Sequence, residues 1–164
     1  MPRNYSPDDI ANWFLAAVDR DAGDSITHLK LQKLVYYAQA WALVLLEDDL
    51  FDENFQAWIH GPVLPSLYSR FAEYRWEALP SPPSEWDVEF DPDTTDLLLD
   101  VYNNYGGLHA RKLEELTHSE PPWLNARNGL SPDQPSNAVI SKTDMATYYS
   151  SLLEFSDAEE EYPS

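Results

Sequence analysis

The chain of 164 residues is long enough for one domain with a substantial core and short for two. Its 29 acidic and 10 basic side chains give a formal net charge of −19, which excludes unaided attraction to phosphate backbones or anionic lipid; we expect neither nucleic-acid binding nor membrane binding. The absence of cysteine excludes disulfides and thiolate metal sites. The first residues lack the apolar core of a signal peptide, so we expect a cytoplasmic protein.

The first predicted element is a helix that begins at Ser6-Pro7-Asp8-Asp9. This sequence offers a capping hydroxyl, a proline at the first helical position and two acids that face the positive end of the helix dipole. Apolar residues then follow helical spacing from Ile10 to Val18, and Gly23 ends the pattern.

The longest apolar run covers residues 29–46, after a cap at Thr27, and predicts a second helix. Its only polar interruptions are Lys30, Lys33, Gln32 and Gln39. At about 100° per residue, the two lysines lie on one side of the helix and the two glutamines roughly opposite. A helix that is apolar nearly all round is normally a buried central element, although the polar stripes predict at least one incompletely covered edge.

The middle of the chain predicts turns and extended structure. A β-hairpin or extended segment is expected near residues 50–60, before the turn signal Gly61-Pro62 and a third helix from Leu64 to Phe71. Three prolines in residues 79–85 exclude a helix there. Residues 86–90 alternate apolar and acidic side chains, which predicts either a short strand or an extended arm.

The last third of the chain is predicted to be helical, and it completes a mainly α fold. We expect a single compact domain of about six helices around the buried central helix, formed by residues 1–155, and an acidic disordered tail at 156–164. The expected later elements are a helix from Asp93 or Thr94 to Gly106-Gly107, a helix at 109–117, a turn from Pro121 in which Trp123 anchors to the core, a loop at 129–137 and a last helix opened by Ser141.

Nothing in the sequence points to catalysis. The four histidines, His28, His60, His109 and His118, form no H-E-x-x-H pair, and each is interpreted as structural or exposed. No G-x-S-x-G elbow or glycine-rich phosphate loop is present. We therefore expect no enzyme, no metal and no cofactor. The least favoured hypothesis is a metal-dependent hydrolase assembled from His60, His118 and nearby acids.

The aromatic content is the strongest remaining signal. Six Trp and ten Tyr are present, and aromatic side chains anchor many protein interfaces. About two thirds of them are expected in the core, because aromatics at helical spacing usually pack inward. Trp58, His60, Tyr68 and Trp123 flank predicted turns, where a side chain can be half available to a partner.

Three ordered motifs resemble the Panacea domain, known from SocA-type antitoxins of bacteria and their phages. Residues 30–39 read KLQKLVYYAQ, residues 51–58 read FDENFQAW and residues 61–68 read GPVLPSLY. They match the family's K-L-Q-K-L-x-Y-Y-A-Q, F-x-E-x-F-x-A-W and G-P-V-x-P-x-x-Y patterns. Matches to V-x-x-x-Y-G, L-x-x-L-T-H-x-E and P-W follow at 101–106, 113–120 and Trp123, so the resemblance extends from about Ile10 to Phe155.

The resemblance implies a non-enzymatic antitoxin whose partner is a toxin protein encoded by a neighbouring gene. Two alternatives stay open: a proteolytic adaptor that delivers the toxin to a protease, as SocA-type members do, and an acidic DNA mimic, suggested by the charge alone. The oligomeric state stays open. The candidate partner-binding residues are Lys30, Lys33, Tyr36, Tyr37, Trp41, Trp58, His60, Gly61, Pro62, Tyr68 and Trp123.

Overall fold

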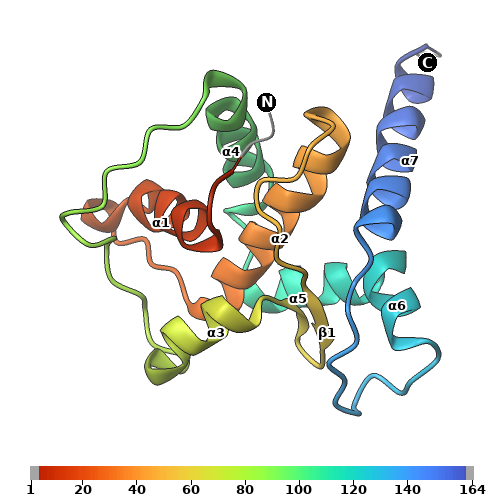
Figure 1. Cartoon of the computed structure of the whole chain (residues 1–164), viewed down its shortest axis with the longest axis horizontal. Coiled ribbons are helices and arrows are strands. Elements are labelled where there is room, and N and C mark those ends of the chain that lie inside the picture. Colours follow the sequence, from red (N-terminus) through yellow and green to blue (C-terminus); the bar gives the residue numbers. More distant parts are fainter. Residues whose placement is uncertain (1–3, 162–164) are drawn as a thin grey trace.

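A computed structural model describes residues 4–161, with side chains to Leu153, as a mainly helical single domain (Figure 1). Seven α-helices lie within this part of the chain, together with two 3-10 helices and one small hairpin, in agreement with the predicted fold class. In chain order the elements are α1 (Pro7–Ala17), η1 (Arg20–Ala22), α2 (His28–Leu45), β1 (Gln56–Trp58), β2 (Gly61–Val63), α3 (Pro65–Phe71), η2 (Ala72–Tyr74), α4 (Pro92–Tyr105), α5 (Ala110–His118), α6 (Pro121–Arg127) and α7 (Lys142–Glu161).

Helix α2 is confirmed as the buried centre of the fold. The hydroxyl of Thr27 accepts the backbone N–H of Lys30 at 3.4 Å and caps the helix as predicted. Twelve of its 18 residues are buried. Helices α1, α4, α5 and α7 and the hairpin pack around it, and Figure 1 shows it crossing the middle of the molecule. This cover on many sides explains why the helix tolerates apolar residues on nearly every face.

The glutamine stripe of α2 is fully covered. The side-chain amide of Gln39 donates to the carbonyl of Phe51 at 2.8 Å, and its oxygen accepts the backbone N–H of Leu50 at 2.7 Å. The side-chain amide of Gln32 likewise donates to the carbonyl of Leu64, and its oxygen accepts the backbone N–H of Leu64. Because buried backbone groups need partners, these two side chains fix the chain on either side of the hairpin against α2.

The predicted hairpin is present, but it lies later in the chain than residues 50–60, and Gly61-Pro62, predicted as a turn, begins strand β2 after a turn at Ile59-His60. Strands β1 and β2 pair antiparallel, and Gln56 lies opposite Val63. On its other edge β1 pairs with the segment before α7, where the backbone N–H of Ala57 donates to the carbonyl of Ala138 at 2.8 Å. The small sheet therefore joins the middle of the chain to its last third.

Residues 86–90 form no strand, so the strand option for this segment is wrong. The segment packs as an arm beside α1. The indole N–H of Trp86 donates to Asp9 at 3.3 Å, and the ring of Phe90 lies 4.8 Å from that of Tyr5. Its alternation of apolar and acidic residues reflects one side facing the protein and one facing solvent.

One predicted helix end and one predicted turn are corrected. Helix α1 ends at Ala17, because Val18 is extended and Asp19 caps the separate helix η1; Gly23, with φ 90°, ends η1 instead. The turn from Pro121 is a full helix, α6. The backbone of α7 is helical up to Glu161, and residues 162–164 lie outside the described residues. The domain boundary at 155 and the disordered tail remain predictions.

Candidate functional site

A groove of about 550 Å³ lies beside the hairpin, and we call it the hairpin groove. It is walled by the start of α2, the β-hairpin, α3 and the loop that precedes α7, which run close together in Figure 1. None of the described residues that line it is Asp, Glu, Lys or Arg. The lining residues are His28, Leu29, Trp58, Ile59, His60, Val63, Tyr68, Pro135, Ser136 and Asn137.

Two aromatic side chains form one wall of the hairpin groove. The ring centroids of Trp58 and Tyr68 lie 4.9 Å apart, and Tyr68 is 39% exposed. The indole N–H of Trp58 donates to the side chain of Gln56 at 2.8 Å, which fixes the ring. His28 lies behind Tyr68, with 5.4 Å between the ring centroids. The groove therefore presents rigid, partly exposed aromatic surface, the type that anchors protein partners.

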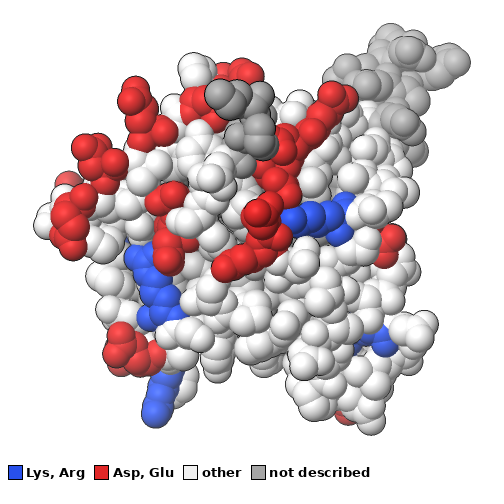
Figure 2. Space-filling view, viewed as in Figure 1, with Lys and Arg blue, Asp and Glu red and all other residues white. Residues whose placement is uncertain are grey.

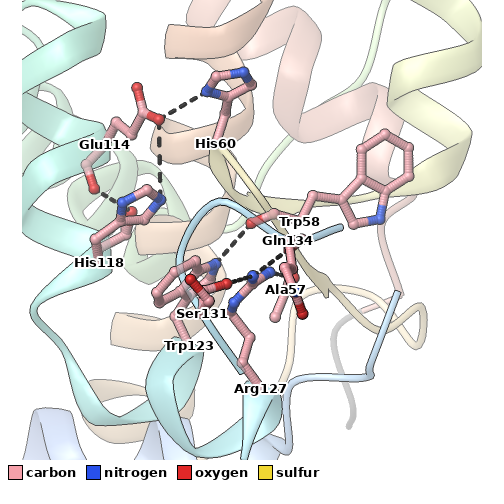
Figure 3. A network of polar contacts seen from close by, with 10 residues as sticks. Ala57, Trp58, His60, Glu114, His118, Trp123, Arg127, Ser131 and Gln134 are labelled. Carbon is pink, nitrogen blue, oxygen red and sulfur yellow. Dashed lines mark hydrogen bonds and ion pairs between the residues drawn. The ribbon is translucent and has the colours of Figure 1, made fainter. Parts of the chain in front are cut away.

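Helix α6 holds the hairpin in place from behind. The indole N–H of Trp123 donates to the carbonyl of Trp58 at 2.9 Å (Figure 3). Arg127 donates to the carbonyl of Ala57 at 2.9 Å, and its guanidinium lies 4.6 Å from the centre of the Trp123 ring. Trp123 and Arg127 are both buried. Trp123 thus anchors to the core, as predicted, and it positions the groove rather than lining it.

At one end of the groove, Glu114 of α5 lies between two histidines (Figure 3). Nδ1 of His60 is 2.7 Å from Oε1 of Glu114, and Nε2 of His118 is 3.9 Å from the same oxygen. Because an ionised carboxylate can only accept, the near contact places a proton on Nδ1 of His60. Burial lowers the pKa of His118, and Glu114 acts against this shift. His118 also stacks on Trp123, with 4.1 Å between the ring centroids.

The buried ammonium of Lys33 lies under the hairpin. The residue is only 1% exposed, and its Nζ makes no hydrogen bond to any described residue. Burial lowers the pKa of Lys33 from 10.5 to about 8, although the charge of Glu114 acts to raise it. A Cβ built on Gly61 would lie 2.8 Å from Cε of Lys33, so the close approach of strand β2 requires glycine at this position.

The eleven candidate residues do not share one surface. Trp58, His60 and Tyr68 line the hairpin groove, and their role in partner binding remains a prediction. Trp41 lies elsewhere, in a cavity of about 440 Å³ between α2 and α4, where it donates to the hydroxyl of Tyr105. Lys30 donates to the carbonyl of Gly106. The candidates buried in this structure are Lys33, Tyr36, Tyr37, Gly61, Pro62 and Trp123.

The buried tyrosines belong to a polar cluster in the core. The hydroxyl groups of Tyr37 and Tyr149 both donate to Oε1 of Glu120, at 2.8 and 2.9 Å. Burial raises the pKa of Glu120, and the two tyrosine hydrogen bonds act in the opposite direction. The hydroxyl oxygens of Tyr36 and Tyr149 lie 3.2 Å apart, within hydrogen-bonding distance. These contacts join α2, α7 and the start of α6, so they hold the fold together.

Sequence reasoning missed much of the groove. It did not select Glu114, which lies one turn before His118 on α5 and could have been noticed by that spacing. Residues 135–137 were expected only as loop, and nothing in their sequence indicates that they close a groove with residues between 28 and 68, which are distant in the chain. His28 was assigned a structural or exposed role; it is buried and lines the groove.

The described part of the chain holds no group of three His, Cys, Asp or Glu residues arranged to bind a metal ion. Among the described helices, none has the length and apolar character needed to cross a bilayer.

Charge is distributed unevenly over the molecule. In the face shown in Figure 2, acidic side chains gather at the left and in a band from the top to the centre, over the end of α2 and the segment that follows it, whereas the lower right part is mostly uncharged. The hairpin and the loop before α7 lie in the lower part of this view (Figure 1). The hairpin groove has no charged residue in its lining, although the protein has a net charge of −19.

Comparison with known proteins places this architecture in a family. No curated protein and no solved structure matches the chain. Residues 31–124 match the family described as antitoxin SocA-like, Panacea domain. The match covers more than half of the chain and includes α2, the hairpin and α3 to the middle of α6. The chain therefore belongs to the SocA-like Panacea domain family of antitoxin-like proteins.

Proposed function

We propose that this protein is the antitoxin of a toxin–antitoxin pair, that it neutralises its toxin by direct binding, and that the hairpin groove contacts the toxin. The observation that carries the proposal is an uncharged groove with partly exposed aromatic side chains on a strongly acidic protein. Exposed apolar surface of this kind costs solvation free energy and commonly marks an interaction site.

The groove has the chemistry of an interface centre. Trp and Tyr supply large contact area with few rotatable bonds, so little conformational entropy is lost when they bind. The groove volume of about 550 Å³ admits a few side chains of a partner, and the remaining contacts would come from its surroundings. The acidic surface elsewhere would accelerate encounter with a basic toxin and would make the association rate fall with salt.

The test begins with the open reading frame adjacent to the gene. The toxin it encodes should arrest growth, co-expression of this protein should restore growth, and the two purified proteins should bind. If no neighbouring product is bound or neutralised, the proposal is refuted.

The groove is tested by Tyr68→Ala and Trp58→Ala. Each should weaken toxin binding about tenfold or more, in the range of interface hot spots. Trp76→Ala is the matched control, because Trp76 is 76% exposed and does not line the groove. It should change the dissociation constant less than about twofold. Unchanged binding by both groove variants, with melting temperatures close to that of the parent, would place the interface elsewhere.

Toxin inhibition by the purified protein and toxin half-life in cells together distinguish simple neutralisation from a proteolytic adaptor. A neutraliser should inhibit the toxin with purified components alone and leave the toxin's half-life in cells unchanged or longer. An adaptor should shorten that half-life, and only in cells that contain the protease. We favour neutralisation because a preformed groove can cover a toxin surface without a further component.

A further inference from the structure

A second cavity adjoins the hairpin groove, and we call it the lysine pocket. Its volume is about 290 Å³. It lies between the start of α2, the hairpin turn and the first turns of α5, and it shares Leu29 and His60 with the hairpin groove. A partner in the groove could therefore reach it with one side chain. The lining residues are Leu29, Lys33, His60, Ala110, Arg111 and Glu114.

Lys33 is one of the residues that line the lysine pocket. Its ammonium is buried, and no described residue accepts a hydrogen bond from it. A buried ammonium without a hydrogen-bond acceptor is strongly unfavourable, because water has been removed and nothing replaces it. Nearly all buried polar groups have partners, so an orphaned donor beside a cavity indicates a ligand that completes it.

The start of helix α5 supplies a second, independent feature. Ala110 and Arg111 are the first two residues of this nine-residue helix, and both line the pocket. The side chain of His109 at the N-cap position makes no capping hydrogen bond. The first N–H groups of a helix carry partial positive charge and favour an anion.

The charges around the lysine pocket favour a small monoanion. Two cations, Lys33 and Arg111, face one carboxylate, Glu114, which is already in contact with His60. The balance is positive in a protein whose net charge is −19. A carboxylate matches this balance, whereas Glu114 would repel a phosphate dianion more strongly.

We infer that the lysine pocket is a recognition subsite for a carboxylate of the partner protein that occupies the hairpin groove. The carboxylate, from an Asp or Glu side chain or from a chain end, accepts a hydrogen bond from the ammonium of Lys33 and lies at the start of α5. Arg111 contributes from the rim of the pocket. This inference rests on the proposed function for the source of the carboxylate, but its chemistry can be tested on the isolated protein.

The first experiment titrates the purified full chain with sodium acetate and, separately, with phosphate. Backbone amide NMR signals of Ala110 and Arg111 report occupancy. Acetate should shift them with saturation, and more tightly than phosphate. Lys33→Met should weaken acetate binding about tenfold or more, as expected for loss of a charge-assisted hydrogen bond. Lys112→Gln is the matched control and should change binding less than about twofold, because Lys112 is an exposed cation next to Arg111 that does not line the pocket.

Absence of a saturable shift at these amides, or equal binding by the Lys33→Met and Lys112→Gln variants, would overturn the inference. Arg111→Gln provides a second variant on an exposed side chain whose replacement should leave the fold intact. It should weaken acetate binding by a smaller factor. Melting temperatures of all variants show whether a loss of binding arises from unfolding.

The second experiment uses the toxin identified by co-expression. Lys33→Met should weaken toxin binding about tenfold or more, and acetate should compete with the toxin. If the toxin binds but neither effect appears, the subsite inference fails and the proposed function stands. If acetate binds as expected but the protein binds no neighbouring gene product, the proposed function fails. A partner protein is then also excluded as the source of the carboxylate. Tighter binding of phosphate than of acetate would identify a free-phosphate site instead and would also overturn the inference.

Discussion

Replacement of Lys33 by methionine should stabilise the isolated protein. Burial lowers the pKa of Lys33 from 10.5 to about 8, so the folded state disfavours the charged form. Since each pH unit of this difference corresponds to about 1.4 kcal/mol, the charge costs the folded state about 3 kcal/mol near neutral pH. Methionine has a similar length and no charge, so Lys33→Met should recover a large part of this free energy. Glu114 keeps its contact with His60 and remains 26% exposed, so the variant leaves no buried unpaired carboxylate.

The pH dependence gives the sign of the effect. Below about pH 8 the lysine is protonated in both the folded and the unfolded state, and the full cost of burial is present. Between about pH 8 and 10.5 the folded protein loses this proton while the unfolded chain keeps it, so the parent gains stability with rising pH. Lys33→Met lacks this gain. Its advantage over the parent should therefore shrink as the pH rises through this range.

Urea denaturation followed by tryptophan fluorescence measures both quantities. The difference between the unfolding free energies of parent and variant should be compared at about pH 7 and about pH 10, because other titrating groups cancel in the difference. A variant that is less stable than the parent at neutral pH, or a difference that does not change with pH, would refute the reasoning. Such a result would mean that the ammonium is well solvated in the folded state.

Three further substitutions test the packing. Glu120→Gln should stabilise the protein at neutral pH, because burial raises the pKa of Glu120 and the ionised carboxylate therefore destabilises the folded state. This advantage should disappear towards about pH 4, and melting curves that show a more stable parent at neutral pH would contradict the prediction. Gly61→Ala should lower the unfolding free energy by roughly 1–3 kcal/mol, because Gly61 has φ 107° and an added Cβ would clash with its neighbours. The control Gly107→Ala should lower it far less, since no atom lies near its Cβ; similar urea midpoints for the two variants would argue against strain. Trp41→Ala should lower the unfolding free energy by less than the roughly 3–5 kcal/mol expected for a fully buried tryptophan, because Trp41 is half-buried. The exposed control Trp76→Ala should change it by under about 0.5 kcal/mol, and an unchanged melting temperature for Trp41→Ala would show that its packing contributes nothing.

Features that depend on neighbouring residues could be predicted from the sequence, whereas features that depend on contacts between distant residues could not. Local signals were mostly reliable: the cap at Thr27 and the helix predicted over residues 29–46 are present, because capping and periodicity depend on neighbouring residues. The turn predicted at Gly61-Pro62 is formed instead by the two preceding residues, Ile59 and His60. Residues 86–90 show the converse. Alternation alone does not supply a neighbouring strand, and the segment packs on α1 as an arm instead.

The candidate site was only partly predictable for the same reason. Trp58, His60 and Tyr68 were selected because they flank predicted turns; all three line the groove, although Tyr68 lies within helix α3. The polar stripes of α2 gave no means to tell which residues would be covered. Lys30 and Lys33 lie on the same side of the helix, yet one donates to the carbonyl of Gly106 and the other is buried without a partner among the described residues.

The sequence by itself determined that this protein is helical, acidic and built around one apolar helix, because composition and periodicity act locally along the chain. Only the tertiary structure decided where the functional surface lies. It brings the start of α2, the hairpin, α3, the start of α5 and the loop before α7 together around two adjoining cavities. No local pattern encodes these meetings, because they depend on how the separate elements pack around α2.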